Sequence, residues 1–130
     1  MIVVDASVLV TALADDGDDG RRARRRLGGE RLSAPEVVDL EVASVLRRLC
    51  TSGQLHNVRA AQALADLDAL RLERVAHRPL LRRCWELRDN VTVYDAAYVA
   101  LAEMLDATLL TADERLTRAP LARCAFELLR

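Results

Sequence analysis

The chain has 130 residues, 52% of them hydrophobic and 30% charged, so we expect one globular domain spanning residues 1–130. All 19 basic residues are arginine, which excludes P-loop nucleotide binding and other mechanisms that need a lysine ammonium group. The formal net charge of −1 gives no overall basic field for nucleic acid, and the four aromatic residues are too few for an extended base-stacking platform. Without a membrane-spanning apolar run or a secretory leader pattern, the expected location is cytoplasmic.

The first half of the chain predicts strands and helices in alternation. Residues 1–4 are a β-branched apolar run typical of a buried strand, and 7–14 predict a short helix. A second strand is expected over 31–34. Pro35 is then expected in the first turn of a helix over 36–51 that Gly53 ends, and a further helix is expected over 58–70.

The second half continues this alternation. Strands are expected over 72–76, 107–110 and 124–129, and helices over 79–87, 92–105 and 113–118. Strands separated by helices predict an α/β fold of three layers, with a central parallel sheet of about five short strands flanked by helices.

Residues 15–26 join an acidic block, DDGDDG, to a basic one, RRARRR. We expect the acidic block to be a loop that caps the positive end of a basic helix, which gives an ordinary solvated helix start. The alternative is an arginine face that contacts RNA phosphates or a protein partner. Its candidate residues are Arg21, Arg22, Arg24 and Arg25.

Cysteine and histidine are sparse. Cys50, Cys84 and Cys124 form no C-x-x-C pair, and the only histidines are His56 and His77. A structural zinc site or a disulfide framework is therefore not expected, and the cysteines are interpreted as free thiols in a reducing compartment.

Four acids lie at positions where a surface charge is not expected, at the ends of predicted strands and helices or within an apolar helix face. Asp5 and Asp113 follow predicted strands, Asp95 opens the helix after Thr92, and Glu41 interrupts an apolar helix face. Each has an ordinary interpretation. Asp5 can be an N-cap, Asp95 can complete a capping box, Glu41 can lie at the edge of its face, and Asp113 can favour a helix start.

Taken together, the four acids predict a metal site. Carboxylates that converge repel one another unless a cation or a proton intervenes. A ligand set of oxygens alone favours Mg²⁺ or Mn²⁺ over zinc, and such an ion suits phosphodiester hydrolysis by activated water. Ser7 is a candidate for orienting a carboxylate or the water, with an ordinary first-turn helix serine as its alternative.

Four segments resemble a known family. IVVDASVLVTAL, PEVVDLEVASVL, YDAAYVALAEML and LLTADERL together resemble a PIN-domain ribonuclease, and among these the VapC-type toxins of type II toxin–antitoxin modules. The resemblance covers nearly the whole chain, in order. It implies a Mg²⁺- or Mn²⁺-dependent endoribonuclease whose catalytic and metal-binding acids are Asp5, Glu41, Asp95 and Asp113.

The resemblance carries further expectations. Thr111 matches a position that helps to hold water or phosphate, and the implied partners are RNA, a small VapB-like antitoxin protein and a second copy of the chain. Some relatives have a further acid where this chain has Arg115, so we expect one well-occupied metal position. Arg115 itself is a candidate phosphate ligand, or else an ordinary surface arginine.

Two other functions compete with the nuclease. An aspartyl-nucleophile phosphatase also begins with a strand ending in Asp, but it needs a second Asp at the position of Ser7. A catalytically degenerate PIN-like module that binds RNA or protein is the other alternative, and the presence of all four acids disfavours it.

Overall fold

The computed structural model describes residues 1–130 and contains one parallel sheet of five strands. The strands are β1 (Ile2–Val4), β2 (Leu32–Pro35), β3 (Leu72–Val75), β4 (Thr108–Thr111) and β5 (Phe126–Leu128). Their order is β3-β2-β1-β4-β5, and every neighbouring pair is parallel. The predicted α/β fold is confirmed, and β1 lies at the centre of the sheet.

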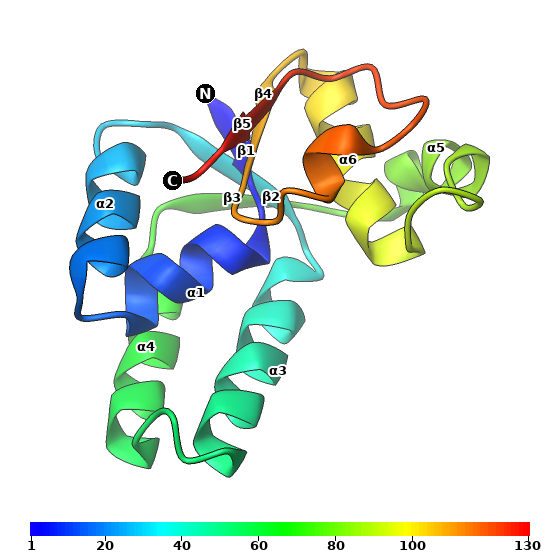
Figure 1. Cartoon of the computed structure of the whole chain (residues 1–130). Helices are drawn as coiled ribbons and strands as arrows, with labels where there is room; N and C mark the ends of the chain where they lie inside the picture. The colour runs from blue at the N-terminus through cyan, green and yellow to red at the C-terminus, as the bar shows by residue number, and fades with distance from the viewer.

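Six α-helices flank the sheet. They are α1 (Ala6–Ala14), α2 (Asp18–Leu27), α3 (Val38–Thr51), α4 (Asn57–Ala69), α5 (Leu81–Glu86) and α6 (Val93–Leu105). Helices α1 to α4 lie on one side, where α3 and α4 form a hairpin that extends beyond the sheet, and α5 and α6 lie on the other (Figure 1). None of these helices is both long and apolar enough to cross a membrane.

The core lies between the sheet and the helices that pack on it. Val3, Val4, Leu109 and Leu110 are completely buried in the two central strands. Helix α6 is rich in alanine, so its backbone can approach the sheet closely, and residues 96–102 are all buried. This close packing fixes the start of α6 against the carboxyl ends of β1 and β4.

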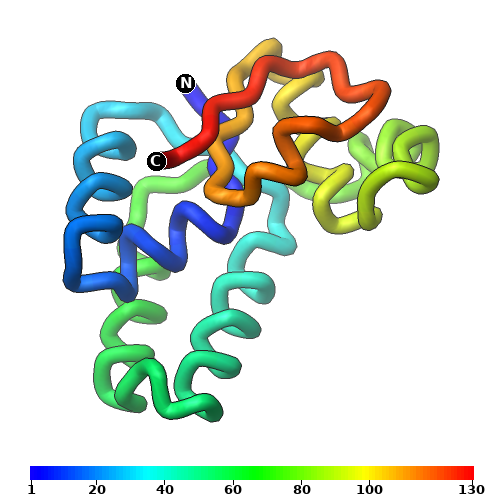
Figure 2. Tube along the Cα trace, in the orientation of Figure 1, coloured from blue at the N-terminus to red at the C-terminus, as the bar shows by residue number.

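The joint between α1 and α2 is tight. A Cβ atom on Gly20 would lie 1.7 Å from the backbone oxygen of Asp15, so no other residue fits there without movement of the backbone. The trace reverses sharply at this point (Figure 2). The prediction of a loop over 15–20 was therefore wrong in its second half, because α2 already begins at Asp18.

Three other boundaries differ from the prediction. Pro35 ends strand β2 instead of opening a helix, and Glu36 makes the next hydrogen bond, from its N–H to the Val75 oxygen. Proline has no N–H, so it is tolerated where a strand ends. The segments predicted as helices over 79–87 and 113–118 contain short 3₁₀ turns, Arg78–Leu80 before α5 and Leu116–Arg118 after β4.

The cysteines form no disulfide, as predicted. Cys84 is buried, and Cys50 and Cys124 are partly buried. Burial, followed by the charge of Glu103, raises the pKa of the Cys124 thiol to about 11, so this side chain is a neutral packing group at physiological pH.

Candidate functional site

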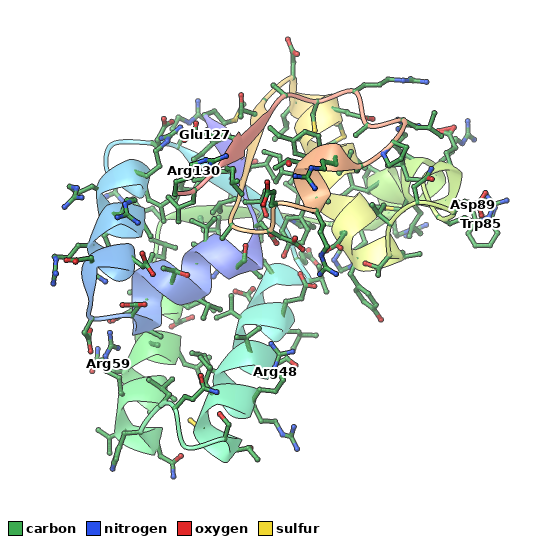
Figure 3. The ribbon with its side chains drawn as sticks, viewed as in Figure 1. Arg48, Arg59, Trp85, Asp89, Glu127 and Arg130 are labelled. Carbon is green, nitrogen blue, oxygen red and sulfur yellow. The ribbon has the colours of Figure 1, made fainter.

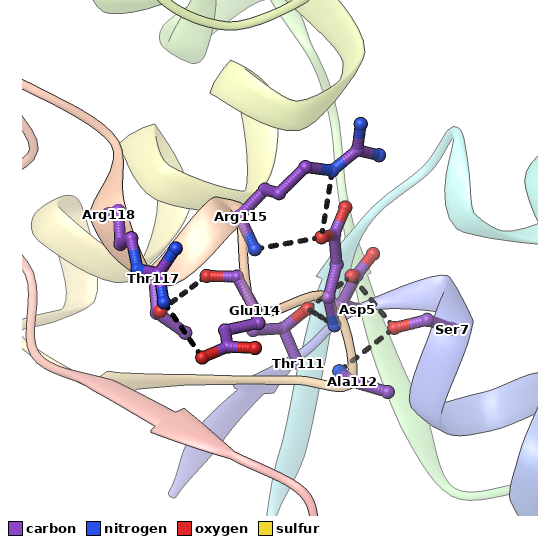
Figure 4. Close-up of polar contacts among 9 residues, drawn as sticks. Asp5, Ser7, Thr111, Ala112, Glu114, Arg115, Thr117 and Arg118 are labelled. Atoms are coloured by element: carbon purple, nitrogen blue, oxygen red, sulfur yellow. Dashed lines mark hydrogen bonds and ion pairs between the residues drawn. The ribbon is translucent and has the colours of Figure 1, made fainter.

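The site begins with Asp5, which follows the central strand and is 7% exposed. Its side chain does not cap helix α1. Ser7 Oγ and Thr111 Oγ1 both donate hydrogen bonds to Asp5 Oδ2, at 2.9 and 2.7 Å (Figure 4). Because both hydroxyls are directed at Oδ2, the second carboxylate oxygen keeps its lone pairs for another ligand.

The same two hydroxyls tie Asp5 to the loop after β4. Ser7 Oγ accepts from the backbone N–H of Ala112 at 3.1 Å, and Thr111 Oγ1 accepts from the N–H of Asp113 at 3.0 Å. Two backbone donors, two hydroxyls and one carboxylate therefore form a continuous network across strands β1 and β4. Thr111 thus bonds both Asp5 and Asp113, while Glu114 lies outside the network and pairs with Arg118.

Glu41 lies on helix α3 and is partly buried. The hydroxyl of Tyr98, a side chain with no exposed surface, donates to Glu41 Oε1 at 2.5 Å. Burial raises the pKa of Glu41, the Tyr98 hydrogen bond lowers it, and the charges of Asp5 and Asp95 raise it, with a net rise. The alternative of an acid merely at the edge of the apolar face does not account for this partner.

Asp95 lies in the first turn of α6, where its backbone N–H donates to Thr92 Oγ1 at 3.0 Å. The expected cap is therefore present. Burial raises the pKa of its carboxyl group, and the charges of Asp5 and Asp113 raise it further. A capping interaction alone would favour the ionised acid, so the rise has other causes, first burial and then the nearby charges of Asp5 and Asp113.

Tyr98 is the residue of this site that sequence reasoning missed. It lies three residues after Asp95 on the same helix, so both project toward the same edge. That spacing was the available signal, but a tyrosine among alanines on a buried helix is more simply interpreted as core. Glu41 and Asp5 both help to raise the pKa of Tyr98 beyond its ordinary range, after burial itself, so the tyrosine remains a hydrogen-bond donor.

Asp113 and Asp95 line one wall of an open cavity of about 560 Å³. Arg115 also lines this cavity. Its side chain is 91% exposed, and its Nε lies 3.5 Å from Asp113 Oδ1 (Figure 4). The exposed guanidinium group is free to approach an anion in the cavity.

The structure thus brings the acids to the carboxyl edge of the sheet. Each of Asp5, Asp95 and Asp113 is close enough to raise the pKa of at least one other member. No three acids, cysteines or histidines are arranged as a ready-made metal-binding group. The available ligands are carboxylate oxygens, which a hard divalent cation prefers and whose mutual repulsion it would relieve. The four acids fit such an ion by their chemistry, although they are not arranged as a complete set of ligands.

The arginines of α2 lie elsewhere and have other partners. Arg21 and Arg22 pair with Asp18 and Asp19 of their own first turn, and Arg24 donates to backbone oxygens at the end of α1. Arg25 is exposed. These contacts match the interpretation as a charge-complemented helix, and none of these arginines lines the cavity beside Asp95. Their contact with RNA stays a prediction.

Comparisons with known proteins place the chain in one family. A family model described as PIN domain matches residues 2–121. The chain is 44% identical to VapC ribonuclease Mb0985 of Mycobacterium bovis over 124 residues, which cover 95% of the chain and 94% of that relative. It is 43% identical to Ribonuclease VapC1 of Mycobacterium tuberculosis over 129 residues, or 98% and 97% of the two chains.

Solved structures share the fold. A VapBC2 structure from Rickettsia felis, bound to a DNA fragment from their promoter, superposes with a TM-score of 0.71 at 18% identity and covers 100% of both chains. Mycobacterium tuberculosis VapC20, described as a sarcin-ricin loop cleaving toxin, gives a TM-score of 0.71 at 17% identity, covering 92% of this chain and 95% of that one. At such identities the likeness establishes architecture alone.

Proposed function

The chain belongs to the PIN domain family, and from that premise we propose that it is a metal-dependent endoribonuclease, the toxin of a type II toxin–antitoxin pair. The names of its relatives, VapC ribonucleases 43% and 44% identical over nearly the whole chain, support RNA as the substrate. The VapBC2 structure among its structural neighbours supports a small antitoxin protein as the partner.

One observation carries the proposal. Asp5 is buried and hydrogen-bonded by two hydroxyls on the same oxygen, with no guanidinium group beside it. Burying a carboxylate in this way is expensive, and the charge of Asp5 helps to raise the pKa of the neighbouring acids Glu41 and Asp95. A site that accumulates such unneutralised charge is suited to a cation.

Each residue then has a defined task. Asp5, Glu41, Asp95 and Asp113 would hold Mg²⁺ or Mn²⁺, with Ser7 and Thr111 fixing Asp5 and Tyr98 fixing Glu41. When bound, the ion would supply Lewis acidity toward water and the phosphate group. Arg115, exposed above Asp113, would pair with a phosphate oxygen of the RNA. No protein nucleophile is needed.

The test is cleavage of a structured RNA by the purified chain, with Asp95→Asn beside Asp89→Asn as a matched control. Asp89 lines the same cavity but is not one of the four acids. We expect Mg²⁺ or Mn²⁺ to support cleavage, a chelator to stop it, and Asp95→Asn to reduce the rate by at least about 100-fold. Asp89→Asn should retain the wild-type rate. Cleavage that survives both the chelator and Asp95→Asn would disprove the proposal.

Calorimetry with Mn²⁺ distinguishes the nuclease from the main alternative, a catalytically degenerate module. A catalytically degenerate module would bind RNA or protein without carboxylate-dependent metal binding. The nuclease should bind Mn²⁺ with an affinity that Asp95→Asn weakens and Asp89→Asn does not. Binding of RNA without either metal uptake or cleavage would favour the degenerate module.

A further inference from the structure

A second feature adjoins the acids in the same cavity. Besides Asp95 and Asp113, its wall contains Arg88, from the segment between α5 and α6. Arg88 and Arg115 are therefore the two cationic side chains that line a cavity whose other charged members are acidic. An RNA strand that places a phosphate at the acids would meet Arg88 as it leaves them.

Arg88 also contacts an exposed aromatic ring. Its guanidinium carbon lies 4.4 Å from the centroid of the Trp85 ring, and its Nη1 donates to the Trp85 backbone oxygen at 2.7 Å. The guanidinium group covers one face of the indole, and yet Trp85 remains 63% exposed. Figure 3 shows Trp85 projecting from the molecule beside Asp89, at the end of α5.

Exposed aromatic rings are few in this chain. Trp85 is the single tryptophan, and of the other three aromatic residues Tyr94 is 62% exposed while Tyr98 and Phe126 are at least partly buried. Leaving so large an apolar side chain in water forgoes the stabilisation that its burial would give. One exposed ring cannot form a long platform, but it can take one base.

From this juxtaposition we infer that Trp85 and Arg88 form a nucleotide-binding subsite for single-stranded RNA next to the acids. Arg88 pairs with a phosphate, and a base stacks on the open face of Trp85. An unpaired base is required, because a base inside a duplex has no free face. The inference rests on the proposed function, which supplies RNA as the substrate class. It adds the path that the RNA takes beyond the bond that is cut.

Stacking also predicts weak sequence discrimination at this subsite. Every base has a π-face, so tryptophan accepts any of them, while a planar guanidinium group can stack on the ring and still donate N–H bonds at its edge. Trp85 and Arg88 would therefore position the RNA and would not choose its sequence.

The single tryptophan makes the test direct. The Asp5→Asn protein, which should leave RNA intact, is titrated in Mg²⁺ with a mixed-sequence single-stranded RNA of about twelve nucleotides while tryptophan emission is followed. We expect saturable quenching by this RNA. An abasic oligomer with the same backbone should bind without quenching. Equal quenching by both oligomers, or by neither, would overturn the stacking role.

Variants in the otherwise wild-type chain give an independent measurement. Trp85→Ala should raise KM for a single-stranded RNA about tenfold and leave kcat unchanged, because stacking contributes to ground-state and transition-state binding alike. Trp85→Phe should recover most of the loss. Arg88→Ala should reduce the salt dependence of RNA binding by roughly one phosphate contact, and Arg88→Lys should preserve that dependence.

Leu81 is the matched control. It lies one turn before Trp85 on the same short helix and is 52% exposed. Leu81→Ala should leave KM unchanged. If Leu81→Ala and Trp85→Ala raised KM equally, or if Trp85→Ala changed the sedimenting mass of the protein, this surface would be a protein contact and the inference would fail.

The outcomes also separate this inference from the proposed function. If RNA quenches the Trp85 emission of Asp5→Asn but is never cut by the wild-type chain, the subsite is supported and the nuclease is disproved. RNA that is cut normally, with neither quenching nor a change of KM in Trp85→Ala, would support the nuclease and disprove the subsite.

Discussion

The carboxylates of this molecule are held in two different ways. Around α2 and the end of α1, acids lie against arginines. Arg59 holds Asp16, and Arg26 bridges Glu30 and Glu127, in each case lowering the carboxyl pKa. At the carboxyl edge of the sheet, the partners of Asp5 and Glu41 are hydroxyl groups, and the pKa of Glu41 is raised.

The kind of partner separates carboxylates that stabilise the fold from carboxylates that can bind a ligand. An acid paired with arginine is already neutralised and has little left to offer a ligand. An acid that only accepts hydrogen bonds from serine, threonine or tyrosine keeps its negative charge and a fixed orientation. The chain has 19 arginines, yet of the four acids at the sheet edge only Asp113 forms an ion pair with one, Arg115, at 3.5 Å.

Removing an arginine partner tests the structural side of this comparison, where we expect the largest effect. Arg83 donates to Glu103 at 2.7 Å and to the Leu121 oxygen at 2.6 Å, and the two charged side chains are only 17% and 14% exposed. Arg83→Ala should lower the free energy of unfolding by about 2–3 kcal/mol in urea titrations. RNA cleavage well below the unfolding temperature should not change.

Arg118→Ala is its control, because the pair of Arg118 with Glu114 is 72% and 60% exposed. Its loss should cost less than about 1 kcal/mol. If Arg83→Ala abolished cleavage while the protein stayed folded, the division between structural and chemical carboxylates would be wrong.

Removing a hydroxyl partner tests the chemical side. Tyr98→Phe deletes the donor to Glu41, whose hydrogen bond lowers the Glu41 pKa. Without that bond the pKa rises further, so protons compete with the metal at higher pH. Cleavage should fall about tenfold, and the acidic limb of its pH profile should move to higher pH.

Tyr94→Phe controls for the general loss of a tyrosine hydroxyl, since Tyr94 is 62% exposed on the first turn of the same helix. It should behave as wild type. The same loss of rate in both variants, or an unmoved acidic limb in Tyr98→Phe, would show that Tyr98 does not act through Glu41.

The smallest effect concerns stability without metal. The pKa of Asp95 is raised by burial and by Asp5 and Asp113, so its folded form binds a proton more readily than its unfolded form. Ionised Asp95 therefore lowers the free energy of unfolding at neutral pH. This loss of stability disappears as the pH falls through the raised pKa of the folded state toward the ordinary pKa of an aspartate. At neutral pH in a chelator, Asp95→Asn should melt a few degrees above wild type.

The gain in Asp95→Asn should shrink toward pH 4 and reverse when Mg²⁺ is added, because only the wild type gains stability from the ion. Asp89→Asn should show neither effect. Thermal melts at several pH values check both signs, and a melting temperature of Asp95→Asn below wild type in chelator would contradict the cluster of like charges.

The places of the four acids in the fold could be predicted from the sequence, because each prediction rested on a local pattern with a simple geometric meaning. Asp5 and Asp113 follow strands, and the ends of parallel strands meet at one edge whatever their order. Glu41 was found because it interrupts an apolar helix face. These inferences needed only local patterns and the assumption of a parallel sheet.

Other features depend on contacts that the local pattern does not encode. The hydrogen bond of Tyr98 to Glu41 joins residues 57 positions apart, and that of Thr111 to Asp5 joins residues 106 apart. Pro35 has a helix-start signature locally, but its pairing with Val75 makes it the end of a strand. Likewise, the spacing of Trp85 and Arg88 does not reveal that Arg88 lines the same cavity as Asp95 and Asp113.

The order of the strands has a consequence for synthesis of the protein. β1 is made first but lies at the centre of the sheet, and its neighbour β4 is made after all six α-helices. Thr111 and the Asp113 loop, which orient Asp5, therefore become available only late in translation. A nascent chain on the ribosome carries Asp5 and Glu41 but cannot assemble the hydroxyl network until translation has passed Asp113, so under the proposed function we expect no RNA cleavage before that point.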